Sequence, residues 1–279
     1  MQEIIVKTKI ILELLPIALY ITVSNSFAQG SLSPSSAPSP LMKTLDQIES
    51  RTPISSLPYT ITESGSYYVT TNLYGVAGEN GITLDANYLN IDLNGFTLDG
   101  LGNASSNGVC STEEYGRYVH IYNGTVCNWG EAGIKASRYS LIENIRSIAN
   151  GIGIETSHNC LIKDCIVIDS TYEGIYARFQ NSITRCTARH NKGHGIRGGQ
   201  GSTINNCVSR HNSGIGIYGY SQSIITDCVA RENDGYGIYA GKGGTVSDCV
   251  SSYNTNGIYG GTSESVGGNS GTLITDCSA

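Results

Sequence analysis

The dipeptide Gly-Ile recurs through the second half of the chain at steps of 20 or 21 residues, and a column of cysteines keeps the same period. The Gly-Ile pairs are Gly133-Ile134, Gly153-Ile154, Gly174-Ile175, Gly195-Ile196, Gly216-Ile217, Gly237-Ile238 and Gly257-Ile258. The cysteines are Cys165, Cys186, Cys207, Cys228 and Cys249. Columns that share one period predict a solenoid in which each repeat forms one coil.

One repeat, GIYGYSQSIITDCVARENDGY over Gly216–Tyr236, shows how a coil is built. Alternation places Ile217, Ile225 and Cys228 inside and Tyr218 and Thr226 outside. Three short strands separated by turns fit this pattern, and the lack of a 3.6-residue period excludes helical and leucine-rich solenoids. The prediction is an all-β, single-stack parallel β-helix of about ten coils of about 21 residues. Its winding is right-handed, because parallel strand crossovers have that hand.

The first 28 residues predict an export signal. Lys7 and Lys9 precede an apolar run, and the small residues Ser26 and Ala28 suit a cleavage site after Ala28. The alternative, a membrane anchor, is disfavoured because the run is short and Pro16 interrupts it. The mature protein is therefore expected to be secreted or at the cell surface, without a membrane span.

Composition and spacing also predict how the rest of the chain is organised. Residues 29–40 are a Ser/Pro linker, and residues 41–58 form an N-terminal cap that includes a short amphipathic helix. Residues 59–279 form the β-helix. Because the sequence stops at Ala279 in the middle of a coil, either missing C-terminal coils or a capping partner are expected. The formal net charge of −6 disfavours nucleic acid and anionic membranes as partners.

The nine cysteines could form disulfides in an exported protein. The regular column favours a buried ladder of thiols instead, because side chains stacked in parallel fit the disulfide torsion poorly. A zinc site is disfavoured because no Cys-x-x-Cys pair occurs.

The repeat G-I-Y-x(n)-I-x-D/N-C-x-A/S-R-x-N resembles the right-handed parallel β-helix repeat of the pectate-lyase-like superfamily. Residues Arg51–Gly100, and Tyr122-Asn-Gly-Thr-Val with Trp129-Gly, resemble exported bacterial β-helix proteins of undefined activity. The resemblance covers about residues 51–279. It implies the fold but no single activity, because the superfamily includes lyases, hydrolases, epimerases, adhesins and phage tailspikes.

Lyase and hydrolase chemistry of this superfamily implies several carboxylates on one outer face, with calcium in the lyases. The outer position after each Gly-Ile is occupied by Lys135, Glu155, Tyr176, Arg197, Tyr218, Tyr239 and Tyr259. With one carboxylate in seven coils, no catalytic set is assigned, and Glu155, Arg178 and Arg197 are the remaining catalytic candidates. Asp227 and Asp248 share a column before the cysteines, which is either a turn column or a Ca²⁺ site; no other cofactor is expected.

Two outer stripes offer binding chemistry. The first is Tyr176, Tyr218, Tyr239 and Tyr259, with Arg197 in the same column. Stacked tyrosines suit sugar rings, and they also stabilise a sheet without any ligand. The second stripe is Arg189, Arg210 and Arg231. An acidic glycan would offset this row of like charge, although a solvated repeat residue explains it equally.

The leading hypothesis is therefore an exported protein that binds an extracellular or cell-surface polysaccharide, with acidic polysaccharides among the candidates. A polysaccharide lyase or hydrolase is the first alternative. A structural or adhesive rod without catalysis is the second alternative.

Overall fold

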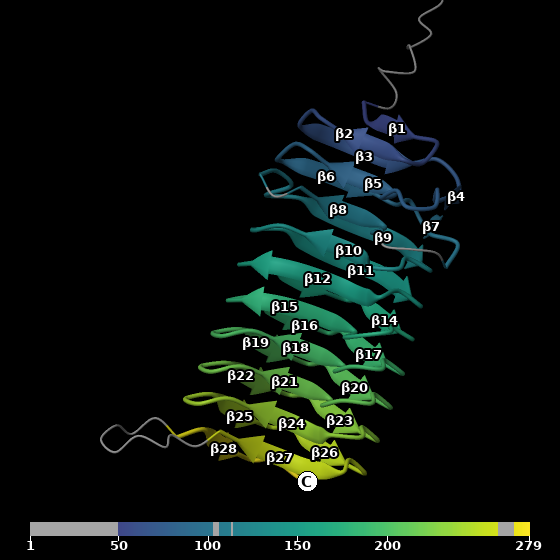
Figure 1. Ribbon diagram of the computed structural model, residues 1–279. Helices are drawn as coiled ribbons and strands as arrows, with labels where there is room; N and C mark the ends of the chain where they lie inside the picture. Colours follow the sequence, from purple (N-terminus) through teal and green to yellow (C-terminus); the bar gives the residue numbers. More distant parts are fainter. Residues whose placement is uncertain (1–49, 103–105, 113, 262–270) are drawn as a thin grey trace, which may run out of the picture. The chain divides into compact units, whose positions relative to one another are not determined.

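The computed structural model describes residues 50–102, 106–112, 114–261 and 271–279, which form stacked strands (Figure 1). No helix occurs among these residues. The predicted signal, linker and helix over residues 41–48 lie outside them. Within the described ranges no helix is long and apolar enough to span a membrane.

One sheet has ten parallel strands and carries the Gly-Ile repeats. Its strands are β2 (Tyr59–Ile61), β5 (Ile82–Leu84), β8 (Val109–Ser111), β10 (Ala132–Ala136), β12 (Ile152–His158), β15 (Ile175–Phe179), β18 (Ile196–Gly198), β21 (Ile217–Gly219), β24 (Tyr236–Ala240) and β27 (Asn256–Gly260). Each strand pairs with the corresponding strand of the next coil, so these ten strands mark about nine turns of a single stack.

The remaining strands form the second sheet, which is also parallel. They are β1 (Thr52–Ile54), β3 (Gly65–Val69), β4 (Leu73–Tyr74), β6 (Leu89–Asp92), β7 (Thr97–Asp99), β9 (His120–Cys127), β11 (Leu141–Ile148), β13 (Leu161–Lys163), β14 (Ile166–Ile168), β16 (Ser182–Thr184), β17 (Thr187–Arg189), β19 (Thr203–Asn205), β20 (Val208–Arg210), β22 (Ile224–Thr226), β23 (Val229–Arg231), β25 (Thr245–Ser247), β26 (Val250–Ser252) and β28 (Leu273–Thr275).

The prediction of three short strands per coil is confirmed in the C-terminal half, where β15, β16 and β17 make one coil. The two middle coils differ, because β9 and β11 are continuous eight-residue strands. Strand β11 pairs with both β13 and β14 of the next coil. The second sheet therefore has two short strands per coil on either side of these two coils, as in β6 and β7 before them and β13 and β14 after them.

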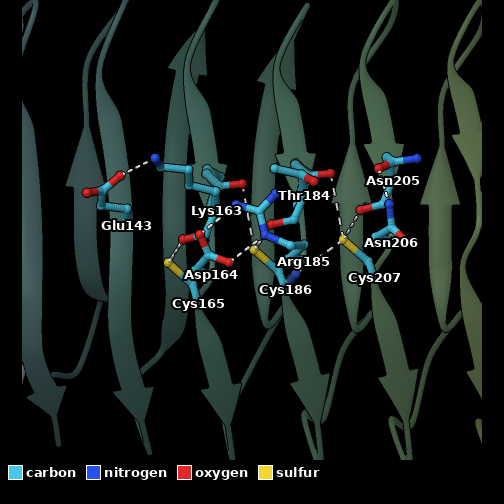
Figure 2. A network of polar contacts seen from close by, with 12 residues as sticks. Glu143, Lys163, Asp164, Cys165, Thr184, Arg185, Cys186, Asn205, Asn206 and Cys207 are labelled. Atoms are coloured by element: carbon cyan, nitrogen blue, oxygen red, sulfur yellow. Dashed lines mark hydrogen bonds and ion pairs between the residues drawn. The ribbon is translucent and has the colours of Figure 1, made fainter.

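The division occurs at a bend directly before each cysteine of the column. Asp164, Arg185 and Asn206 occupy this bend in successive coils, and all have left-handed φ values between 52° and 55°. These three side chains are exposed and the cysteines that follow them are buried; Figure 2 shows both sets in successive coils. The turn interpretation of this column is confirmed, because one residue in the left-handed region reverses the inward and outward alternation.

The interior consists of columns of identical or similar side chains. Ile175, Ile196, Ile217 and Ile238 are fully buried, as are Ile183, Ile204, Ile225 and Val246. The five cysteines of the column are also buried, and all nine cysteines of the chain are free thiols. The inward assignments made from alternation are therefore confirmed, and the core extends continuously along the stack.

A ladder of buried asparagines closes the turn before each Gly-Ile. Asn191 donates from Nδ2 to Oδ1 of Asn212 at 2.8 Å, and Asn212 repeats the bond to Asn233 at 2.9 Å. The Oδ1 atoms of Asn212 and Asn233 also accept from the backbone N–H of the asparagine in the preceding coil. The amides satisfy one another and the backbone, which allows a polar column to be buried.

Candidate functional site

The outer face of the ten-stranded sheet carries the column predicted from the position after Gly-Ile. The strand register aligns Lys135 with Glu155, Glu155 with Tyr176, and Tyr176 with Arg197. It then aligns Arg197 with Tyr218, followed by the two tyrosines of β24 and β27. Because each isoleucine before these residues is turned into the core, the side chains of the column are turned to the outside.

The tyrosines of this column contact one another. The ring centroids of Tyr218 and Tyr239 are 5.0 Å apart, with planes at 78°, and those of Tyr239 and Tyr259 are 5.2 Å apart at 20°. Tyr220 and Tyr236 extend the cluster to either side. Burial and the neighbouring Tyr220 raise the pKa of Tyr218 to about 12, so its hydroxyl stays protonated at neutral pH.

Arg197 is held in one orientation between these rings. Its Nη1 donates to Glu173 at 3.1 Å, and its Nη2 donates to the Tyr220 hydroxyl at 2.9 Å. The guanidinium also lies 4.7 Å from the Tyr176 ring centroid, a distance typical of a cation–π contact. Burial opposes the charge of Arg197, but the bonds to Tyr220 and Glu173 outweigh it and raise its pKa.

Two cavities lie beside each other on this face and share Arg178. One has a volume of about 470 Å³ and includes Tyr176, Arg197 and Tyr220 in its lining. The other, of about 340 Å³, is lined by Lys135 and Glu155 together with five serine and threonine residues. The face therefore combines an aromatic hollow with a polar one.

The structure separates the three catalytic candidates into two ion pairs. Glu155 accepts from Arg178 at 3.0 Å, whereas Arg197 is paired with Glu173. Glu173, which directly precedes Gly174, and Tyr220, which lies two positions beyond the column, were not among the predicted site residues. The sequence alone does not show that side chains three residues before and two after the column turn toward it.

The arginine stripe lies on the other sheet. Arg189, Arg210 and Arg231 are aligned with one another on β17, β20 and β23. The two stripes predicted from the sequence are both present as columns. They do not form one site.

Asp227 and Asp248 occupy the bend column, and both have a φ of 53°. Asn205 donates to Oδ2 of Asp227 at 3.1 Å, and in an earlier coil Asp164 binds Arg185 through both carboxylate oxygens at 2.7 Å. Within the described ranges, no group of three or more His, Cys, Asp or Glu side chains is arranged to hold a metal ion.

Comparison with known proteins places this fold among β-helices. A family model described as a right handed beta helix region matches residues 107–271. The solved structure of the Dettilon tailspike protein is similar with a TM-score of 0.56 and 13% identity, over 71% of this chain and 54% of the tailspike. ORF18 of Geobacillus virus E2 is similar with a TM-score of 0.55 and 14% identity, over 72% of this chain and 49% of that protein.

A third similar structure is the A-module of the mannuronan C-5 epimerase AlgE4 of Azotobacter vinelandii. It has a TM-score of 0.43 and 12% identity, over 75% of this chain and 85% of the module. No curated protein matches the sequence. The chain spans about half the length of the two viral proteins, and at these identities the likeness concerns the fold alone. Because the family model covers more than half of the chain, the protein belongs to the right-handed β-helix family.

Proposed function

We propose that this protein binds a polysaccharide along the outer face of the ten-stranded sheet. The observation that carries the proposal is the fixed arrangement of Tyr176, Arg197 and Tyr220 around the cavity of about 470 Å³. A hollow with an aromatic floor and a few oriented polar groups is typical of small-molecule and sugar sites. The ion pair with Glu173 holds the arginine in place before any ligand arrives.

The chemistry of the face suits sugar rings. Tyrosines present apolar ring faces with a hydroxyl at the rim, and a sugar presents apolar C–H faces with hydroxyls at its edge. The tyrosine cluster continues over several coils, so a chain of sugars running along the stack meets repeated contacts. The alternative role of the cluster is to stabilise the sheet by contacts between strands.

The charges on this face nearly balance. Lys135, Arg178 and Arg197 lie among Glu131, Glu155 and Glu173, and two of the ion pairs are formed. A neutral or weakly acidic glycan therefore fits this face better than a densely charged one. If residues 1–28 direct export, as their sequence predicts, this glycan lies outside the cell.

The test is binding to a panel of neutral and acidic polysaccharides by wild-type protein and two variants. Tyr218→Ala and Tyr239→Ala each remove a ring from the cluster, and each is expected to weaken binding by about three- to tenfold. Tyr253→Ala is the matched control, because Tyr253 is 82% exposed and lies on the turn after β26. If no glycan binds, or if both tyrosine variants bind as tightly as the wild-type protein, a structural rod without catalysis becomes the better account.

Polysaccharide cleavage is the second candidate, and the polar cavity around Lys135 and Glu155 is the observation that favours it. Glu155 is the only carboxylate of the outer column from Lys135 to Tyr259, whereas glycoside hydrolysis ordinarily uses two. We expect neither new reducing ends nor unsaturated ends that absorb in the near ultraviolet. If wild-type protein releases either product and the Glu155→Gln variant does not, the protein is an enzyme, and cleavage replaces simple binding as its function.

A further inference from the structure

The arginine stripe on the second sheet is a separate surface with its own unbalanced charge. Arg189 pairs in register with Arg210, and Arg210 pairs with Arg231. Neighbouring strands lie about 4.8 Å apart, so three guanidinium groups follow one another at short spacing. Like charges this close repel unless an anion lies between them.

Carboxylates lie at both ends of the stripe: Asp169, whose backbone N–H donates to the carbonyl of Arg189 at 3.2 Å, and Glu232, which follows Arg231. Glu232 accepts from Arg231 Nη2 at 3.2 Å and from His211 Nε2 at 2.7 Å, so its carboxylate is engaged by two partners. No described carboxylate forms an ion pair with Arg189 or Arg210, and the buried Nε of Arg210 has no hydrogen-bond partner there. Two adjacent guanidiniums therefore have donors that the described part of the protein does not satisfy.

A pair of histidines borders these two arginines. His190 and His211 directly follow Arg189 and Arg210 in the chain, and both have left-handed φ values. Their rings stack in parallel with centroids 5.0 Å apart and planes within 6°. Both side chains are exposed, so they add N–H groups at the edge of the arginine pair.

We propose that Arg189 and Arg210, bordered by His190 and His211, form a binding site for the oxyanion of an acidic polysaccharide, either a sulfate or a carboxylate. The planar fork of a guanidinium pairs with both oxygens of such a group, and an anion between two forks relieves their repulsion. The site lies on a different sheet from the tyrosine face. It stands or fails independently of the function proposed above.

A polysaccharide fits this site better than a nucleic acid. DNA carries one charge per about 1.7 Å of its axis, and specific proteins typically neutralise about six to ten phosphates. Here the site has only two arginines without an ion-pair partner, on the neighbouring strands β17 and β20, and the chain has a net charge of −6. A polymer with one charge per sugar matches two binding groups and meets less repulsion from the rest of the protein.

The experiment measures binding of heparin, for sulfate, and polygalacturonate, for carboxylate, by titration calorimetry with the full chain. Arg189→Gln and Arg210→Gln are each expected to weaken binding by about tenfold, because each removes hydrogen bonds to a charged group. Arg210→Lys keeps the charge but not the fork, and it should retain part of the affinity. Arg146→Gln is the matched control, because Arg146 is exposed on β11 of the same sheet and outside the stripe.

Unchanged binding in both stripe variants, or an equal loss in Arg146→Gln, would overturn the site. Tighter binding of a DNA oligonucleotide than of either glycan at the same salt would overturn the choice of polysaccharide. Inorganic sulfate or phosphate that binds as tightly as the polymers would assign the site to a free ion instead. The Tyr218→Ala variant should bind heparin with the same affinity as the wild-type protein, even if its affinity for neutral glycans changes.

Discussion

Each cysteine of the buried column donates its thiol hydrogen to the backbone carbonyl two residues earlier. The Sγ–O distances are 3.1 Å from Cys165 to Lys163, 3.3 Å from Cys186 to Thr184 and 3.2 Å from Cys207 to Asn205 (Figure 2). The thiol thus bridges the bend, which explains why a small side chain with a weak donor recurs there. Burial of these side chains disfavours the charged, reactive thiolate form.

We expect the column to stay reduced and unreactive while the protein is folded. In native protein a thiol reagent should modify the five buried cysteines far more slowly than Cys110 and Cys127, which are only partly buried. After denaturation without reductant, five or more thiols should react. A single reactive thiol in the denatured protein would show that the column forms disulfides.

At the scale of the strands, Trp129 explains how the irregular first coils fit together. Its ring is almost fully buried, and its Nε1 donates to the carbonyl of Leu98 at 3.1 Å. Four glycines from neighbouring coils lie against the ring: Gly75, Gly81, Gly100 and Gly108. A side chain at any of them would meet the indole, so these glycines make the space into which the tryptophan packs.

The variant Gly100→Ala tests this packing. The added Cβ would lie 2.6 Å from the Asn128 carbonyl oxygen and 2.6 Å from Cδ2 of Trp129, so the backbone or ring must shift. We expect a loss of about 1–3 kcal/mol in the free energy of unfolding. Denaturant unfolding followed by the fluorescence of Trp129, the single tryptophan, measures it. Gly271→Ala is the control, because its Cβ would meet nothing within 4 Å. Equal stability of the two variants would contradict the packing argument.

Sequence reasoning succeeded where one coil repeats the next. The alternation around Gly-Ile placed Ile217 inside and Tyr218 outside, because strand periodicity is a local property. Sequence reasoning failed where side chains in different coils contact each other across a sequence separation that differs from the 21-residue repeat. Arg197 meets Glu173 and Tyr220, which are 24 and 23 residues away, and no single column contains these pairs. The single tryptophan belongs to no column at all, so its glycine surroundings follow from three-dimensional packing.

At the scale of the whole molecule, each coil is stabilised chiefly by its two neighbours. The register pairs every strand of the ten-stranded sheet only with the preceding and following coil. Stability in such a stack is approximately a sum of coil and interface contributions, so damage in one coil need not reach a distant one. Trp129 precedes β10, and Ile217 begins β21, four strands farther along that sheet. This separation is about 20 Å at the usual strand spacing.

The variant Ile217→Asp should therefore uncouple the two ends of the stack. Ile217 is fully buried between Ile196 and Ile238, and a carboxylate there has no partner, so the free energy of unfolding should fall by several kcal/mol, on the order of 3 or more. We expect β-sheet circular dichroism to decrease at lower denaturant than the Trp129 fluorescence changes, because the C-terminal coils unfold first. Ser213→Asp, on an exposed turn, should leave both transitions as in wild type. Coincident transitions at reduced denaturant would show that the coils unfold as one unit, and an unchanged midpoint would show that Ile217 is not inside.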